Sequence, residues 1–162
     1  MIKDVELKIG QEMRDKGWRL AVAESCTGGL IGHRITNIPG SSTYYLGSIT
    51  AYAYRAKVRL LDVSWDTLEK YGAVSEQTIE QMARGVRRAL TADIGLAVSG
   101  IAGPSGGTPT KPVGYTWIGL SSIQGTRTLQ HNASGNRIEN KQEIAQVALE
   151  FLYQFLIEDG TD

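Results

Sequence analysis

Residues Ala23–Gly29 bring a hydroxyl, a thiol and two glycines to a point where a strand should turn into a helix. The segment reads Ala-Glu-Ser-Cys-Thr-Gly-Gly, between an apolar run at 18–22 that predicts a buried strand and a helical stripe that begins at Leu30. A turn that opens a helix presents free backbone N–H groups and the positive end of the helix dipole. It can therefore hold a phosphate or stabilise an oxyanion, and Ser25 is a candidate nucleophile.

A serine nucleophile needs a base within hydrogen-bond reach. His33 lies two turns along the expected helix, and His131 lies among polar residues beyond the last expected strand, so neither is well placed. A lysine can replace histidine when burial lowers its pKa. Lys57 follows the second expected strand and could share a sheet edge with Ser25, as in serine–lysine dyads. Position alone favours a solvated surface cation, so the pairing stays open on these grounds.

Cys26 is a competing nucleophile, because a helix N-terminus lowers the pKa of a thiol. Neighbouring residues on a turn point in different directions, so only one of Ser25 and Cys26 can face a cavity. We interpret Cys26 as a small buried apolar residue. For Ser25, a helix cap or a plain phosphate ligand remains as open as catalysis.

A second glycine-rich segment covers residues 100–114, directly after a buried strand expected over 94–99. Five glycines and three prolines within it predict a long loop, and such loops are usually functional or disordered. Its first part, Gly100–Gly107, could bring N–H groups near an anion or a nucleotide, although it matches neither a Walker motif nor the dinucleotide fingerprint. Two glycine-rich loops at strand ends point to one site more strongly than either does alone.

The composition limits the classes of function. The 162 residues fit one domain, 1–162, and their 17 basic and 17 acidic side chains give no bulk attraction to nucleic acid or to a membrane surface. The single cysteine excludes an intrachain disulfide framework and favours a cytoplasmic setting. No stretch resembles a signal peptide or the roughly 20 apolar residues of a membrane span. The cysteine and two histidines are not clustered, so we expect no metal and no cofactor.

Helical and strand patterns alternate along the chain. An apolar stripe from Ile2 to Met13 predicts a first helix, and Ser75 is the expected N-cap of the most regular one. Further helices are expected after residue 29, within 53–61, over 65–71 and over 144–155, and strands over 18–22, 45–52, 94–99, 115–121 and 126–130. The last two strands should be antiparallel and joined at Gln124-Gly125. The order predicts a three-layer α/β/α sandwich with a mixed, mostly parallel sheet.

Four sequence blocks, in this order and spacing, resemble the CinA C-terminal domain family, which includes nicotinamide mononucleotide deamidases. The resemblance runs from about Val5 to Leu156. The blocks are Ala23–Gly29, Gly47–Tyr52 with Lys57 after it, Gly72–Glu76, and Ser99–Pro104 with Lys111–Gly114.

The resemblance implies hydrolysis of the carboxamide of nicotinamide mononucleotide to a carboxylate and ammonia. It assigns Ser25 as nucleophile, Lys57 as base, and Tyr52 as a residue that orients Lys57 or relays a proton. The N–H groups near Thr27, Gly28 and Gly29 would stabilise the oxyanion. The substrate's ribose phosphate would be held by the later loop, through Ser99, Gly100, Ala102, Gly103 and Gly106, together with Arg137.

The chain departs from the family pattern at two positions. Tyr54 stands where asparagine is frequent and could reshape the pocket or supply a hydroxyl itself, and Ser99 stands where threonine is common. The expected ligand is a small nucleotide, and the resemblance also leaves a homo-oligomer open. An alternative function is a non-catalytic nucleotide- or phosphate-binding module with a regulatory role in competence or the response to DNA damage.

Overall fold

A five-stranded sheet with the order β2-β1-β3-β4-β5 forms the centre of the molecule. The structure, a computed structural model, describes residues 1–158, so the last four residues of the expected domain lie outside it. β1 pairs in parallel with β2 and β3, whereas β4 is antiparallel to both β3 and β5. Four of the five strands therefore point the same way. The strands are β1 (Leu20–Glu24), β2 (Tyr45–Thr50), β3 (Ile94–Gly100), β4 (Tyr115–Ser122) and β5 (Gly125–Asn132).

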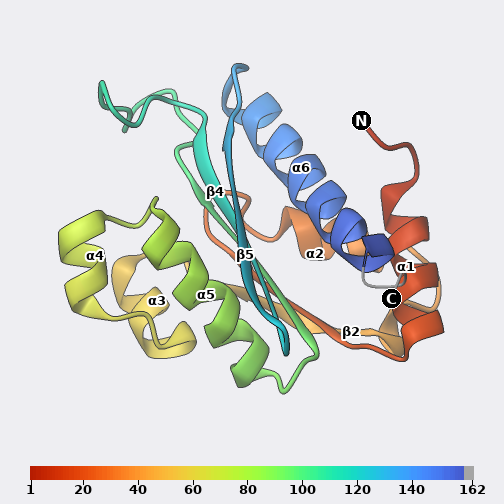
Figure 1. Ribbon diagram of the computed structural model, residues 1–162. Helices are drawn as coiled ribbons and strands as arrows, with labels where there is room; N and C mark the ends of the chain where they lie inside the picture. The colour runs from red at the N-terminus through yellow and green to blue at the C-terminus, as the bar shows by residue number, and fades with distance from the viewer. Residues whose placement is uncertain (159–162) are drawn as a thin grey trace.

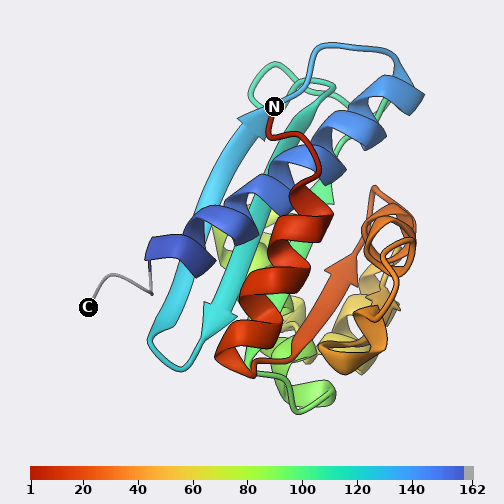
Figure 2. The same ribbon diagram turned by 90° about the vertical axis from the view of Figure 1, so that its right-hand side faces the viewer.

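Helices cover both faces of this sheet, which confirms the three-layer sandwich with a mixed sheet (Figure 1). On one face, α1 and α6 lie side by side along the strands, with α2 near the β2 edge (Figure 2). The other face carries α3, α4 and α5. The helices are α1 (Val5–Lys16), α2 (Leu30–Thr36), α3 (Tyr54–Leu61), α4 (Trp65–Tyr71), α5 (Glu76–Ala89) and α6 (Arg137–Glu158), with a short 3-10 turn at Ser41–Thr43. No helix within residues 1–158 is long and apolar enough to cross a bilayer.

The two faces of β1 differ in side-chain size. Leu20 and Val22 join the core beneath α1 and α6, whereas Ala21 and Ala23 face the core beneath α5. Alternate side chains of a strand point to opposite faces, so this pattern separates the two cores. The small residues let α5 approach the sheet and α3 closely. At Gly85, an added Cβ would lie 1.9 Å from the carbonyl oxygen of Leu61, the last residue of α3.

Most predicted elements are present, with shifted ends. The expected N-cap at Ser75 is confirmed, because its side chain accepts a hydrogen bond from the Thr78 N–H. The first strand runs from Leu20 to Glu24 and not from residue 18, because Gly17 ends α1 in a left-handed conformation and residues 18–19 form neither helix nor strand. The hairpin turn lies at residues 123–124, one position earlier than predicted.

Gly85→Ala tests the close approach of α5 to α3. In an open helix, alanine is more favourable than glycine by about 1 kcal/mol, but here the methyl group meets backbone. We expect the free energy of unfolding to fall by about 1–3 kcal/mol in urea titration, as for other overpacked sites. Gly10→Ala is the matched control, since its nearest neighbours are side-chain ends of Tyr44 and Arg14. The close packing would be contradicted if Gly85→Ala lowered the free energy of unfolding no more than Gly10→Ala does.

Candidate active site

Ser25 and Lys57 meet at the carboxyl edge of the two parallel strands β1 and β2. Ser25 follows β1 directly, and Lys57 lies in the first turns of α3, which follows β2. Parallel pairing of Glu24 with Thr50 brings the two strand ends together. The Lys57 Nζ lies 2.9 Å from the Ser25 Oγ. Both residues are buried, with 1% of Lys57 and 7% of Ser25 exposed, so the surface-cation interpretation of Lys57 is wrong.

The surroundings of Lys57 are apolar apart from a few oxygen atoms. Its ammonium group donates to the backbone carbonyls of Ala51 at 2.7 Å and Tyr52 at 3.1 Å. Within residues 1–158 it forms no ion pair with a carboxylate. Burial disfavours the charged form and lowers the pKa of Lys57 to about 8. A lysine with this pKa is neutral often enough near pH 7–8 to act as a base.

A buried carboxylate holds the turn that carries Ser25. Glu24, the last residue of β1, is fully buried. Its Oε2 accepts from the Thr27 hydroxyl at 2.6 Å and from the Gly29 and Ile31 N–H groups at 3.0 and 3.1 Å. Its Oε1 accepts from the Gly32 N–H at 2.9 Å. The carboxylate thus satisfies the first N–H groups of α2, the part of a helix that otherwise lacks partners.

This arrangement changes the expected oxyanion site. The Gly29 N–H is used by Glu24, and the Gly28 N–H donates to the Ser25 carbonyl at 3.2 Å. Neither glycine is free to bind an oxyanion, contrary to the sequence-based expectation. Within the described part of the chain, the backbone N–H groups of Cys26 and Thr27 donate to no backbone carbonyl, and the Cys26 N–H interacts with its own thiol. These two groups, next to Ser25, are the available donors.

Cys26 does not have the character of a nucleophile. Only 5% of the residue is exposed, and it belongs to the apolar core beneath α1 and α6. Burial raises the pKa of its thiol to about 11. The interpretation of Cys26 as a small buried apolar residue is confirmed.

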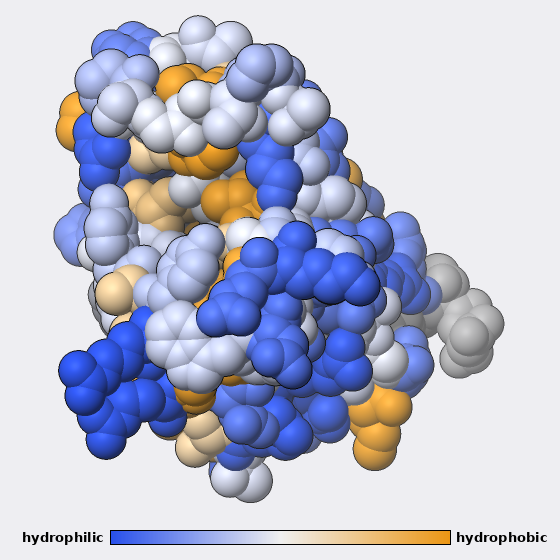
Figure 3. All heavy atoms as spheres, turned by 90° about the vertical axis from the view of Figure 1, so that its left-hand side faces the viewer, coloured by the Kyte–Doolittle hydropathy of each residue, from blue (hydrophilic) through white to orange (hydrophobic). Residues whose placement is uncertain are grey.

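Ser25 and Lys57 open into a cavity of about 200 Å³. Of the expected binding residues, Ser99, Gly100, Ala102 and Arg137 line it. The other expected binding residues do not line it, namely Thr27, Gly28, Gly29, Gly103 and Gly106. The remaining lining residues are Ser25, Cys26, Tyr52, Lys57, Ala73 and Val74. Figure 3 views the molecule from the side of α4, where the surface is hollowed and apolar atoms show between hydrophilic rims.

Several predicted residues contact partners other than those expected. The Ser99 hydroxyl donates to the Ala73 carbonyl at 2.8 Å, so it fixes the loop before α5. The Tyr52 hydroxyl accepts from the Arg137 guanidinium at 3.2 Å, and only the Tyr52 backbone carbonyl reaches Lys57. Arg137 also donates to the Gly103 carbonyl. Tyr52 therefore positions Lys57 through its backbone and Arg137 through its hydroxyl.

Tyr54 is not among the residues that line the cavity. Its ring packs against Trp65, with the ring centroids 6.4 Å apart. Neither histidine lines the cavity, and His131 pairs with Glu143 at 2.7 Å.

Two structural residues of the site escaped sequence reasoning. Besides Glu24, Asn140 of α6 is fully buried. Its side chain donates to the Ala102 carbonyl at 3.1 Å and accepts from the Gly135 N–H at 2.8 Å. Two features of the sequence could have indicated them. Glu24 ends an apolar strand, and Asn140 lies on the apolar side of the last helix. A buried polar side chain at such a place requires hydrogen-bond partners.

The fold and the site together define a three-layer α/β domain with a buried serine–lysine pair at a parallel-strand edge. The model of the CinA C-terminal domain family matches residues 2–156, and the chain belongs to this family. Among solved structures, the CinA superfamily protein of Klebsiella pneumoniae 700603 superposes with a TM-score of 0.92 at 28% identity, covering 96% of this chain and 97% of that one. The competence/damage-inducible protein CihA of Agrobacterium tumefaciens has a TM-score of 0.87 at 36% identity, covering 94% and 95%.

Relatives of two lengths resemble the sequence. A CinA-like protein of Desulfosudis oleivorans is 50% identical over 154 residues, which are 94% of this chain and 37% of the relative. The chain thus spans about a third of the length of such relatives. The nicotinamide-nucleotide amidohydrolase PncC of Enterobacter agglomerans is 44% identical over 150 residues, which are 92% of both proteins.

Glu24→Gln tests the carboxylate that holds the Ser25 turn. An amide has one acceptor oxygen and would place its N–H₂ against N–H groups, so at least one buried donor loses its partner. We expect the free energy of unfolding to fall by about 2–4 kcal/mol in urea titration. Glu80→Gln on the outer side of α5, where Glu80 pairs with the half-exposed Arg84, is the control and should change it by less than about 0.5 kcal/mol. Equal stability of the two variants would contradict this role of Glu24.

Proposed function

We propose that the chain is an amidohydrolase that converts nicotinamide mononucleotide to nicotinate mononucleotide and ammonia. The observation that carries the proposal is the buried contact of 2.9 Å between the Lys57 Nζ and the Ser25 Oγ, without a carboxylate to keep the lysine charged. The similarity to a PncC along nearly its whole length supports the choice of substrate.

The hydrogen bonds around Lys57 allow it to change its protonation state without moving. The Lys57 Nζ donates to the Ser25 Oγ and to the Ala51 and Tyr52 carbonyls. After it loses one proton, two N–H groups can still donate to the carbonyls, and the lone pair can accept the proton of the Ser25 hydroxyl. Lys57 then takes the Ser25 proton as the Oγ attacks the carboxamide carbon. The Cys26 and Thr27 N–H groups stabilise the oxyanion, an interaction whose loss typically costs about 100- to 1,000-fold in rate.

The remaining steps return both residues to their starting state. The Lys57 ammonium gives its proton to the departing amide nitrogen as the C–N bond breaks, and ammonia leaves. Water then attacks the ester formed with Ser25, with Lys57 taking its proton. The C–O bond to Ser25 breaks, the serine oxygen regains the proton, and the nicotinate product is released.

The alternative of a non-catalytic phosphate-binding module makes a different demand on Lys57. A phosphate-binding lysine should keep its charge, and a solvated or paired position would serve that role. Burial without a carboxylate partner instead lowers the pKa of Lys57, which supports the catalytic proposal.

Substitutions of Ser25, Cys26 and Lys57 test the assignment of the reacting groups. We expect Ser25→Ala and Lys57→Arg each to reduce ammonia release from nicotinamide mononucleotide by more than about 1,000-fold. Ser25→Ala removes the attacking hydroxyl, and the guanidinium of Lys57→Arg cannot accept a proton. Cys26→Ala, next to Ser25, is the matched control and should retain most activity. Retained activity in Ser25→Ala with its loss in Cys26→Ala would overturn the choice of nucleophile.

The pKa of Lys57 sets the expected pH dependence. The base works only when deprotonated, so kcat/KM should rise about tenfold per pH unit below pH 8 and level off above it. The profile is obtained from initial rates of ammonia release between pH 6.5 and 9.5, with circular dichroism as a check of folding. A flat or falling profile through pH 8 would contradict a lysine base.

A further inference from the structure

One side of the cavity is formed by a segment without regular structure. Ala73 and Val74 line the cavity, and they lie in the connection between the end of α4 at Tyr71 and the start of α5 at Glu76. Such a connection lacks the ladder of backbone hydrogen bonds that holds a helix or a strand in place. Contacts from elsewhere therefore have to fix its position beside Ser25.

Side-chain donors bind each backbone carbonyl from Tyr71 to Val74. The two outer carbonyls, those of Tyr71 and Val74, both accept from the Lys111 ammonium at 2.8 Å. The two inner carbonyls accept from hydroxyl groups, those of Ser75, Thr78 and Ser99. Lys111 thus holds both ends of the segment. It comes from a distant part of the chain, since 40 and 37 residues separate it from its two partners.

The charge of Lys111 suits this position. Tyr71 is the last residue of α4, and the final carbonyls of a helix lack partners within the helix and attract a cation. Within residues 1–158 the Lys111 ammonium forms no ion pair with a carboxylate. Hydrogen bonds from a charged donor are roughly twice as strong as those between neutral groups. Loss of Lys111 should therefore loosen the segment more than loss of one hydroxyl.

Lys111 also ends the exposed part of the second glycine-rich segment. Residues 104–110 are all exposed, and the connection between β3 and β4 extends beyond the sheet on the side of α4 (Figure 1). Before these residues, Arg137 holds the Gly103 carbonyl. After them, Lys111 fixes the chain to the connection between α4 and α5. The exposed loop is therefore anchored at both ends, and its second anchor holds the side of the cavity.

We propose that Lys111 is a positioning residue, which keeps the side of the cavity formed by Ala73 and Val74 in the place where the substrate binds. This inference rests on the proposed amidase function. Ser25 and Lys57 are carried by other elements, the turn after β1 and helix α3. The cavity side contacts the substrate before and during the reaction alike. Lys111 therefore acts on substrate binding more than on the rate of the bound substrate.

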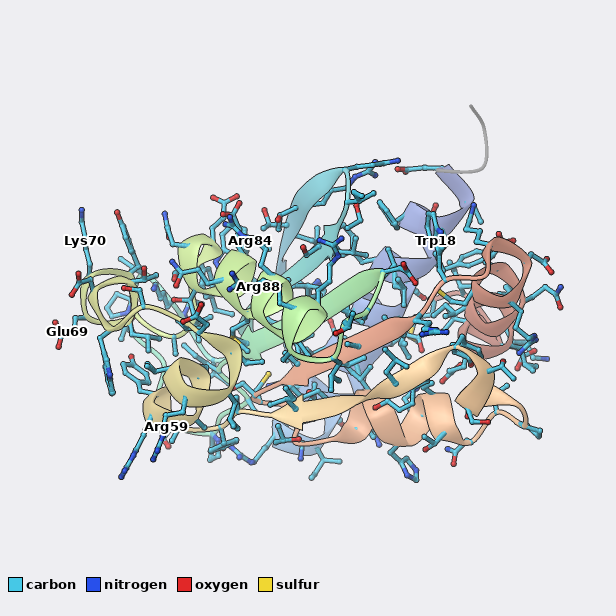
Figure 4. All side chains as sticks on the ribbon, turned by 90° about the horizontal axis from the view of Figure 1, so that it is seen from below. Trp18, Arg59, Glu69, Lys70, Arg84 and Arg88 are labelled. Carbon is cyan, nitrogen blue, oxygen red and sulfur yellow. The ribbon has the colours of Figure 1, made fainter. Side chains whose placement is uncertain are left out.

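Lys111→Met tests this role through the kinetics of ammonia release from nicotinamide mononucleotide. We expect KM to rise about 10- to 100-fold, because two hydrogen bonds of a charged group are lost, and kcat to change less than about threefold. Partial unfolding would instead lower the apparent kcat and leave KM unchanged. Lys70→Met is the matched control, because Lys70 carries the same charge next to Tyr71 but points outward from α4 (Figure 4). An unchanged KM in Lys111→Met, or an equal rise in Lys70→Met, would overturn the proposal.

Chemical restoration of the ammonium separates its role from that of side-chain size. Lys111→Cys should show the same high KM as Lys111→Met. Its thiolate displaces bromide from 2-bromoethylamine, which rebuilds a side chain of nearly the length and charge of lysine, and KM should return to within about threefold of wild type. Wild type treated alike is the control, because Cys26 is buried and its thiol has a raised pKa. A treated Lys111→Cys that keeps the high KM would contradict the positioning role.

Hydrogen exchange separates the anchor from the proposed function. The Gly72 N–H donates to a carbonyl of α4 and the Thr78 N–H to the Ser75 hydroxyl, so these amides report on the two ends of the segment. We expect both to exchange about tenfold faster or more in Lys111→Met, and at the wild-type rate in Lys70→Met. If wild type releases no ammonia from nicotinamide mononucleotide, the proposed function fails, and faster exchange still supports the anchor. If wild type deamidates it but exchange in Lys111→Met is unchanged, only the anchor fails.

Discussion

The buried carboxylate of Glu24 is the interaction on which the rest of the site depends. It accepts four hydrogen bonds from the turn and from the first residues of α2, so these four donors keep a partner where the chain leaves the sheet edge in a tight turn. That turn gives Ser25 its position beside Lys57. Glu24 also takes the N–H groups that a glycine-rich turn would otherwise offer to a ligand. Part of the hydrogen-bonding capacity of this segment is thus used internally.

The burial of Lys57 is unfavourable for folding and useful for chemistry. Packing between α3, α5 and the sheet excludes water from its ammonium group, and only two backbone carbonyls and the Ser25 hydroxyl compensate. The same desolvation lowers the pKa of Lys57 to about 8. The close contact at Gly85 fixes the end of the helix that carries this lysine. Strain of this kind is expected where a fold supports a reactive group.

Local sequence patterns predicted the elements, and the resemblance to the family added the pairing of Ser25 with Lys57. Neither predicted which hydrogen-bond partners the side chains of the site have. The strand, turn and helix around Ser25, the N-cap at Ser75 and the irregular segment at 100–114 depend on neighbouring residues, and all are present. The direction of the Tyr52 hydroxyl depends instead on Arg137, 85 residues away. The loss of Gly29 as an oxyanion donor depends on a carboxylate whose burial was not evident from its neighbours. The role of Lys111 was not evident either, because only the tertiary fold brings its ammonium to the Tyr71 and Val74 carbonyls.

The antiparallel hairpin explains how the C-terminal helix reaches a site built by parallel strands. β3 ends at the same edge as β1, and β4 carries the chain back to the opposite edge. β5 then returns it, so α6 begins near the Ser25 turn (Figures 1 and 2). The mixed sheet therefore places Arg137 and Asn140 against the second glycine-rich segment, although β4 and β5 contribute no residue to the cavity lining.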